Sequence, residues 1–158
     1  MMSMCPICFE LYSNLWSKPC CSCGHQTIIL SVELIGAVKL LIDRGFIVSG
    51  ATCTTHDDQV KKGKTTQIRI DFKATYPQAL FEELPPDWLL SNYNLAKDGM
   101  VFEPDLSMLT CVCSHPPNES DSLSIEFDKI LTIYNMETWL QGKYPEACKA
   151  LLRLYGCL

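Results

Sequence analysis

The chain has 158 residues, of which 47% are hydrophobic and 20% are charged. This size and composition fit one globular domain and exclude a disordered, collagen-like or coiled-coil protein. The net charge of −5 is unevenly divided, because residues 1–75 carry eight Lys/Arg and six Asp/Glu (+2) and residues 76–158 carry five and twelve (−7). A protein that coats a nucleic-acid duplex needs a basic stripe and a high pI, and the charge excludes that class.

The N-terminal sequence Met1–Cys5 lacks a basic segment followed by a long apolar run, which argues against a secretory signal. The most apolar stretch, 27–42, is interrupted by Glu33 and Lys39 and does not predict a membrane span. We therefore expect a cytoplasmic protein with no membrane partner. Thiols stay reduced in that compartment, which makes clustered cysteines candidates for metal binding rather than for disulfides.

The spacing of apolar residues predicts the elements after residue 25. In chain order they are a strand over 26–30, a helix over 32–44, a strand over 46–53, a polar loop over 54–64, a strand over 66–73, an irregular segment over 76–94, strands over 108–113 and 123–127, and helices over 129–140 and 145–155. Ser31 is the expected N-cap of the first helix, and Gly45 lies where a glycine commonly follows a helix. In 66–73, Ile68, Ile70 and Phe72 alternate with polar residues, as in a half-buried strand.

This order of strands and helices predicts an α+β fold, in which a mainly antiparallel sheet has helices packed on one face. An N-terminal zinc-knuckle lobe is expected in front of it, because five of the ten cysteines lie within residues 1–25. The expected division is a zinc-binding lobe over 1–25 and an α+β domain over 26–158, which together form one compact unit.

The first cysteines follow the spacing of a metal site. Cys5 and Cys8 form one C-x₂-C pair, and Cys23 forms a second pair with either Cys20 or Cys21. Two such pairs suit a tetrahedral Cys₄ zinc site, because each turn directs two thiolates at one ion. We predict a structural zinc on Cys5, Cys8, Cys20 and Cys23, with Cys20 chosen over Cys21 by the C-x₂-C spacing.

The residues around these pairs leave alternatives open. A small residue is needed directly after the second cysteine of each turn, and Gly24 meets that need whereas Phe9 does not. His25 could replace one thiolate, and the cysteines could instead be buried packing residues or a redox pair. The motif resembles the zinc-ribbon or zinc-knuckle class of small domains, and that resemblance implies a closed site in which zinc folds the lobe and performs no chemistry.

Two later segments place a thiol and an imidazole at the end of a predicted strand. They are Cys53 with His56, and Cys113 with His115. These four residues could form a second metal site, or Cys53 could be a nucleophile with His56 as its base. The simplest interpretation is that the cysteines pack in the core and the histidines lie on the surface.

Residues 31–35, 43–46 and 49–56 resemble a helix-then-strand unit of small uncharacterised bacterial proteins, in which a Cys-Ser-Gly-His-like turn follows the strand. The sequence Phe-Glu-Glu-Leu-Pro-Pro-Asp-Trp at 81–88 is similar to their Leu-Pro-x-x-Trp segment. The same unit is similar to the tRNA wybutosine-synthesis methyltransferase family, whose Cys-Ser-Gly-Arg turn corresponds to Cys-Thr-Thr-His at 53–56. The first resemblance implies a fold without an assigned activity, and the second implies an RNA-modifying enzyme.

A short basic patch, Lys61, Lys62 and Lys64, lies between two predicted strands. Three ammonium groups around Gly63 could hold a phosphate or an RNA backbone, although lysines at a hairpin tip also keep strand edges from pairing. The sequence therefore favours a binding or interaction module for nucleic acid or protein over an enzyme. The alternative is a nucleotide- or RNA-modifying enzyme with its site near Cys53 and His56, and a further possibility is a subunit whose acidic half docks on a basic surface.

Overall fold

The computed structural model describes residues 1–158 except 14, 16–17 and 94–104. In this part of the chain, seven strands form one sheet in the spatial order β2-β1-β3-β4-β5-β7-β6. All neighbouring strands are antiparallel except β3 and β4, which are parallel. The strands in chain order are β1 (Met2–Met4), β2 (Leu11–Tyr12), β3 (Ile28–Leu30), β4 (Val48–Asp57), β5 (Lys64–Phe72), β6 (Trp88–Tyr93) and β7 (Leu106–His115).

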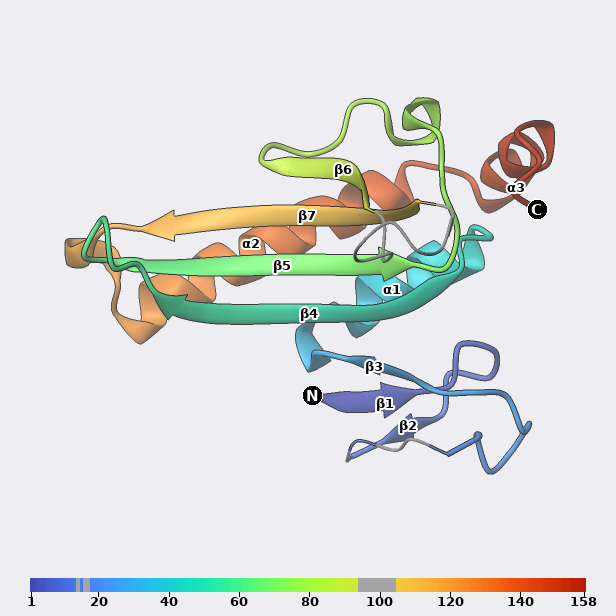
Figure 1. The fold of residues 1–158 in the computed structure, drawn as a ribbon, viewed down its shortest axis with the longest axis horizontal. Coiled ribbons are helices and arrows are strands. Elements are labelled where there is room, and N and C mark those ends of the chain that lie inside the picture. Colours follow the sequence, from blue (N-terminus) through green and yellow to red (C-terminus); the bar gives the residue numbers. More distant parts are fainter. Residues whose placement is uncertain (14, 16–17, 94–104) are drawn as a thin grey trace, which may run out of the picture.

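Helices cover one face of this sheet. The α-helices are α1 (Ile35–Asp43), α2 (Ser122–Gln141) and α3 (Pro145–Leu154), and the short 3₁₀ turns are η1 (Val32–Leu34), η2 (Gln78–Phe81) and η3 (Pro117–Glu119). Figure 1 shows α1 and α2 lying behind β4, β5 and β7, with α3 beyond the end of the sheet. The predicted α+β class, with a mainly antiparallel sheet and helices on one face, is confirmed.

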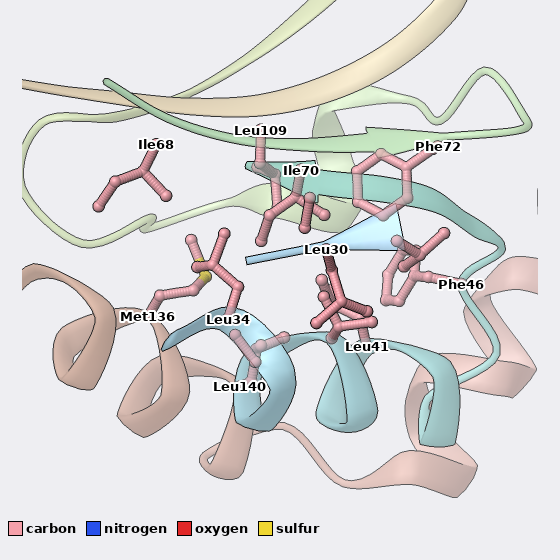
Figure 2. Close-up of a cluster of buried hydrophobic side chains, with 14 of the residues drawn as sticks. Leu30, Leu34, Leu41, Phe46, Ile68, Ile70, Phe72, Leu109, Met136 and Leu140 are labelled. Atoms are coloured by element: carbon pink, nitrogen blue, oxygen red, sulfur yellow. The ribbon is translucent and has the colours of Figure 1, made fainter. Parts of the chain in front are cut away.

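The hydrophobic core fills the space between the sheet and the helices, as Figure 2 shows. In β5 the predicted alternation is confirmed, because Ile68, Ile70 and Phe72 are buried while the residues between them are not. From the helical layer, Leu41 and Met136 point toward these side chains. Burial of this apolar surface supplies the main stabilisation of the domain.

Arg44 joins the ends of the two helices that cover the sheet. Its Nε–H donates to the carbonyl oxygens of Leu140 at 2.8 Å and Lys143 at 2.9 Å, and its Nη1 donates to the carbonyl oxygen of Leu40 at 3.0 Å. The last carbonyl groups of a helix carry partial negative charge, which stabilises a cation placed there. A buried guanidinium therefore holds the end of α1 against the end of α2.

The cysteine-rich lobe shares the sheet with the rest of the molecule. Strand β1 pairs with β2 on one side and with β3 on the other. Met4, at the end of β1, is fully buried in the common hydrophobic core. The segments 1–25 and 26–158 are thus joined by main-chain hydrogen bonds and by core packing.

Two predicted elements differ from the structure. Residues 123–127 were expected to form a strand and instead form the beginning of α2. The alternation of Leu123, Ile125 and Phe127 resembles a strand pattern, yet the Asp121 carboxylate accepts the N–H groups of Leu123 and Ser124 and starts a helix there. The segment 76–94, expected to be irregular, contains η2 and the edge strand β6, and residue 94 lies outside the described residues.

The first helix also begins differently. Ser31 makes no side-chain cap hydrogen bond to η1 or α1. Its Oγ accepts the main-chain N–H of Cys53 at 2.9 Å and so joins the start of the helical segment to β4. Gly45 has φ +93 directly after the last turn of α1, as its predicted position requires. The loop expected over 54–64 is shorter, because β4 extends to Asp57 and β5 begins at Lys64.

Candidate metal centre

The two C-x₂-C segments form the same turn twice. In the first, the N–H of Cys5 donates to the carbonyl oxygen of Glu10 at 2.9 Å, and the N–H of Phe9 donates to that of Cys5 at 3.0 Å. In the second, the N–H of Cys20 donates to the carbonyl oxygen of His25 at 2.8 Å, and that of Gly24 donates to Cys20 at 2.8 Å. Equivalent positions therefore make equivalent main-chain hydrogen bonds, and each turn presents its two thiols on the same side.

Each turn ends at a residue with positive φ. Gly24 has φ +74, which glycine adopts without a steric penalty. Phe9 has φ +60, which costs a residue with a side chain about 1–2 kcal/mol. The aromatic ring offsets part of this cost, because it packs against the core and lies 5.5 Å from the ammonium of Lys39. The sequence predicts that Phe9 fits this position poorly. In the structure its backbone is strained, and the packing of its ring offsets part of that strain.

The four sulfur atoms lie at the corners of a small cluster. The Sγ atoms of Cys5 and Cys23 are 3.3 Å apart, and those of Cys8 lie 3.5 Å from Cys20 and 3.7 Å from Cys23. All four lie within 4.8 Å of one another. Four sulfurs bound tetrahedrally at about 2.3 Å from a zinc ion are separated by roughly 3.8 Å. The cluster therefore has the dimensions of a four-coordinate metal site and could hold a metal ion.

The structure also decides which of Cys20 and Cys21 belongs to the sulfur cluster. Cys20 is 3% exposed and belongs to the four-sulfur cluster, whereas Cys21 is exposed and outside it. The N–H of Cys21 donates to the hydroxyl oxygen of Tyr12 at 2.8 Å, and that hydroxyl donates to the sulfur of Cys20 at 3.5 Å. His25 is not part of the four-sulfur cluster and instead places Nδ1 3.4 Å from the sulfur of Cys23.

The surroundings of Cys5 favour a thiolate. Burial by itself raises the pKa of this thiol, but hydrogen bonds from the main-chain N–H groups of Cys8 and Ile7, together with those from the thiols of Cys23 and Cys8, bring the pKa down to about 6. The N–H of Ile7 lies 3.5 Å from that sulfur. Main-chain donors that stabilise a negative sulfur also stabilise a metal thiolate, since the ligand must lose its proton to bind.

The predicted basic patch forms the turn between β4 and β5. Lys64 Nζ lies 3.1 Å from the carboxylate of Asp57, so this ammonium is paired. The carboxylate of Asp58 accepts the N–H groups of Val60 and Lys61 at 3.0 and 2.9 Å and shapes the turn. Lys61 and Lys62 are exposed beside these two acids. Lys61 and Lys62 therefore lie in a hairpin turn of mixed charge, and Lys64 begins β5 directly after it.

Gly63 lies at a position of the turn where no side chain fits. A side chain at this position would collide with the carbonyl oxygen of His115 at the end of the neighbouring strand β7. The glycine is required by this close main-chain approach. Its position between the lysines needs no phosphate ligand to account for it.

Cys53 and His56 lie on opposite faces of the sheet. Cys53 is paired with Ile68 and faces the helices, whereas His56 is paired with Thr65 and is exposed on the other face. Residues three apart in a strand point to opposite sides. Burial raises the pKa of the Cys53 thiol to about 11, which makes it a weak nucleophile at neutral pH. The structure does not bring these two residues together as a nucleophile and base.

His115 and Cys113 also lie on the helix-facing side. The Nε2 atom of His115 is 2.9 Å from Thr66 Oγ1, and its Nδ1 is 3.0 Å from the carboxylate of Asp128 on α2. Cys113 Sγ lies 3.4 Å from Thr132 Oγ1. Among the described residues, only the four N-terminal cysteines gather as a group of three or more potential metal ligands, so Cys53, His56, Cys113 and His115 do not assemble a second site.

Sequence reasoning missed the polar chain that links three strands to a helix. The Thr55 and Thr66 hydroxyls are 2.7 Å apart, and Thr66 continues through His115 to Asp128. Thr66 is fully buried although it is polar. A threonine in phase with Ile68 in an alternating strand was the available signal, because a buried hydroxyl must find a hydrogen-bond partner. His115 is thus satisfied within the fold.

No helix in the described part of the chain is long and apolar enough to cross a membrane. All ten cysteines lie in that part, and each is a free thiol. The resemblances to small bacterial proteins and to the wybutosine-synthesis methyltransferase family stay predictions. Comparison of the chain with protein-family models, with curated proteins and with solved structures gives no match.

Proposed function

We propose that this protein is a zinc-stabilised protein-binding module in which Cys5, Cys8, Cys20 and Cys23 hold one Zn²⁺ ion. The observation that carries the proposal is the repeated turn that brings the four thiols within 4.8 Å of one another. Four thiolates in a tetrahedral arrangement suit zinc or an iron–sulfur centre, and two C-x₂-C turns around one ion are typical of structural zinc. The same turns support a lobe of the zinc-ribbon or zinc-knuckle class.

The zinc stabilises the lobe and performs no reaction. Four protein ligands fill a tetrahedral site and leave no position for a substrate or a water molecule. The strands of the lobe, β1 and β2, have only three and two residues, so their own hydrogen bonds contribute little stability. A cytoplasmic location belongs to the same proposal, because a reducing compartment keeps the thiols available to the metal.

A protein is a better partner than a nucleic acid for this molecule. The net charge is −5, and Asp57 and Asp58 lie beside the predicted basic patch, with Lys64 already paired to Asp57. Binding to a nucleic acid depends on unpaired cations placed along a phosphate backbone. The alternative of a nucleotide- or RNA-modifying enzyme places its site near Cys53 and His56, and the position of these residues on opposite faces of the sheet argues against a shared site.

Metal analysis of two matched variants tests the zinc site. We expect about one equivalent of zinc in the wild-type protein, no retained zinc in Cys20→Ser, and an unchanged zinc content in Cys21→Ser, because only Cys20 lies in the sulfur cluster. Substitution with Co²⁺ adds an absorption spectrum that distinguishes tetrahedral thiolate ligation. Iron in place of zinc, no bound metal, or equal metal loss in both variants contradicts the proposal.

RNA binding is the outcome that would replace the protein partner. Titration of labelled single-stranded RNA at low salt is expected to show no salt-dependent binding above that of an acidic control protein. Binding that weakens with a log–log salt slope of about −0.7 for each neutralised phosphate, and that the combined change of Lys61, Lys62 and Lys64 to Ala removes, would assign the partner to RNA.

A further inference from the structure

Helix α2 is apolar on two sides. Its inner side carries four buried residues, Ile125, Ile133, Met136 and Leu140. Its outer side also carries five large apolar residues, here named the α2 stripe: Leu123, Phe127, Ile130, Leu131 and Tyr134. Packing against the sheet explains the first set and leaves the second unexplained.

The α2 stripe is continuous and strongly exposed. Leu123 is 81% exposed, Phe127 64% and Ile130 63%, and Tyr134 is 61% exposed. Residues spaced by three, four and seven positions lie along one side of an α-helix, so these side chains follow one another over three turns. Single exposed apolar residues are common, but a contiguous row of this size marks an interaction surface.

A hollow lies at the N-terminal end of the α2 stripe. It has a volume of about 530 Å³ and is lined by Leu123, Ser124, Phe127, Asp128 and Glu119. Its lining combines the apolar side chains of Leu123 and Phe127 with the carboxylates of Glu119 and Asp128. This chemistry suits an aromatic side chain that ends in a hydroxyl group, because the ring is buried while the O–H finds an acceptor.

The charges beside the α2 stripe are divided by position along the helix. The N-terminal half is flanked by four acids, Glu119, Asp121, Glu126 and Asp128, whereas the C-terminal half carries one, Glu137, beside the uncharged residues Asn135, Thr138 and Gln141. Lys129, whose side chain is 11% exposed, binds Glu33 and Glu126 and so pairs with one of these acids. Two parallel copies of α2 would bring the two strongly acidic halves together, whereas two antiparallel copies place the strongly acidic half of one beside the less acidic half of the other.

We propose that the α2 stripe binds a second copy of this chain, with the two α2 helices packed antiparallel around a twofold axis near Ile130 and Leu131. In this arrangement Phe127 of one copy lies opposite Tyr134 of the other, and the tyrosine enters the hollow beside Leu123, with its hydroxyl near Asp128. Such an interface is the same on both copies, as a twofold dimer requires. The proposal names the partner of the protein-binding role proposed above and does not depend on the zinc ion.

The exposed area agrees with a dimer of moderate affinity. With roughly 200 Å² for a large side chain, the exposed fractions of the α2 stripe give on the order of 600 Å² for each copy. The pair therefore buries about 1,200 Å², which is at the lower end of specific interfaces. We expect a dissociation constant on the order of 10 μM, so the dimer forms at high protein concentration and dissociates on dilution.

Analytical ultracentrifugation of the full chain tests the dimer. Between about 1 and 300 μM, where dilution crosses the expected dissociation constant, the wild-type mass is expected to rise from that of one chain to that of two. Phe127→Glu and Ile130→Glu are expected to weaken the dimer at least 100-fold, because each buries an unpaired charge. Val60→Glu is the matched control, since Val60 is 89% exposed in the hairpin turn outside the α2 stripe, and its dimer is expected to be unchanged.

Circular dichroism and zinc content, measured on the same samples, separate misfolding and metal loss from loss of the dimer. A wild-type protein that stays monomeric at 300 μM with its zinc bound overturns the dimer and leaves the zinc site standing. A dimer that survives both stripe variants, or that Val60→Glu weakens equally, also overturns the proposed interface.

The orientation has its own test. A photo-crosslinking amino acid in place of Phe127 is expected to capture the peptide that contains Tyr134. Capture of the peptide that contains residue 127 itself would indicate parallel helices and contradict the proposed arrangement.

Discussion

The backbone conformation of two residues with positive φ shapes the candidate metal centre together with its four thiols. Gly24 and Phe9 occupy equivalent positions after the second cysteine of each turn, with φ +74 and +60. The glycine reaches this conformation freely, whereas Phe9 combines it with a ring that packs on the core. Replacing Gly24 in the second turn therefore tests the backbone conformation by itself, whereas replacing Phe9 in the first turn would also remove the packing of its ring.

Gly24→Ala tests the backbone contribution to metal binding. No atom lies within 4 Å of a Cβ built at this position, so the cost arises from φ and amounts to about 1–2 kcal/mol. Competition with a chromophoric chelator is expected to show roughly tenfold weaker zinc retention. Gly142→Ala is the control because Gly142 has a helical φ of −70, and its zinc retention is expected to be that of the wild type. Equal retention in both variants would show that the turn does not need a left-handed residue.

At the scale of elements, α2 shows why a local pattern can mislead. Leu123, Ile125 and Phe127 alternate with polar residues, which is typical of a strand. In the helix, Ile125 is buried while Leu123 and Phe127 are exposed on the outer side. Alternation appears because both sides of this helix are apolar, and the carboxylate of Asp121 decides the outcome by capping the first turn.

Lys129 on α2 gives an expected pH dependence of stability. Its ammonium lies 3.1 Å from Glu33 of η1 and contacts Glu126 of α2 at 2.6 Å. Burial lowers the pKa of Lys129, but hydrogen bonds to Glu126 and Glu33 outweigh this effect and raise it. Burial raises the pKa of Glu33, and its own main-chain N–H and Lys129 outweigh that effect and lower it.

The raised pKa of Lys129 means that its contribution is present below about pH 10 and lost as the pH rises further. The lowered pKa of Glu33 means that its contribution is present above about pH 4 and lost as the pH falls through its folded pKa. Lys129→Met is therefore expected to cost about 0.5–1 kcal/mol near neutral pH, with a smaller difference from the wild type at both extremes. Urea unfolding of both proteins at each pH measures the difference.

Lys149→Met is the control for Lys129→Met, because Lys149 pairs with the exposed Glu146 at 3.5 Å on α3. Its effect on the free energy of unfolding is expected to be near zero at every pH. A Lys129→Met effect that does not change with pH would assign this residue a packing role instead of an ion-pair role.

At the scale of the whole molecule, one sheet contains long strands with extensive pairing and short strands with little pairing. Strands β4 and β5 pair over nine positions and β5 and β7 over eight, and α1 and α2 cover them. Strands β1 and β2 pair at only two positions. We therefore expect the cysteine-rich end to depend on the proposed metal and the central strands to depend on the core.

Metal removal tests this difference in strength. Hydrogen exchange after treatment with a strong chelator is expected to accelerate in residues 5–26 and in β1 and β2, while β4, β5 and β7 keep their protection. The physical reason is that the thiolate ligands hold the short strands, and the core holds the long ones. Equal acceleration across the whole sheet would mean that the metal stabilises the entire fold, and no change would contradict a structural metal.

The sequence by itself determined the features that depend on neighbouring residues. Two C-x₂-C segments predict two turns because the spacing within each turn is local. The alternation of β5 and the apolar spacing of α1 likewise predict which side of each element is buried. These features, with the fold class that follows from their order, agree with the structure.

Only the tertiary structure decided which residues meet across the sheet. It extended β4 past Cys53 to Asp57 by pairing with β5, enclosed His115 between Thr66 and Asp128, and paired Lys64 with Asp57. Each outcome depends on the register of two strands or on a helix far along the chain, and a one-residue change of register would reverse every face. Short-range spacing contains no such information, because pairing is set by burial of the whole core.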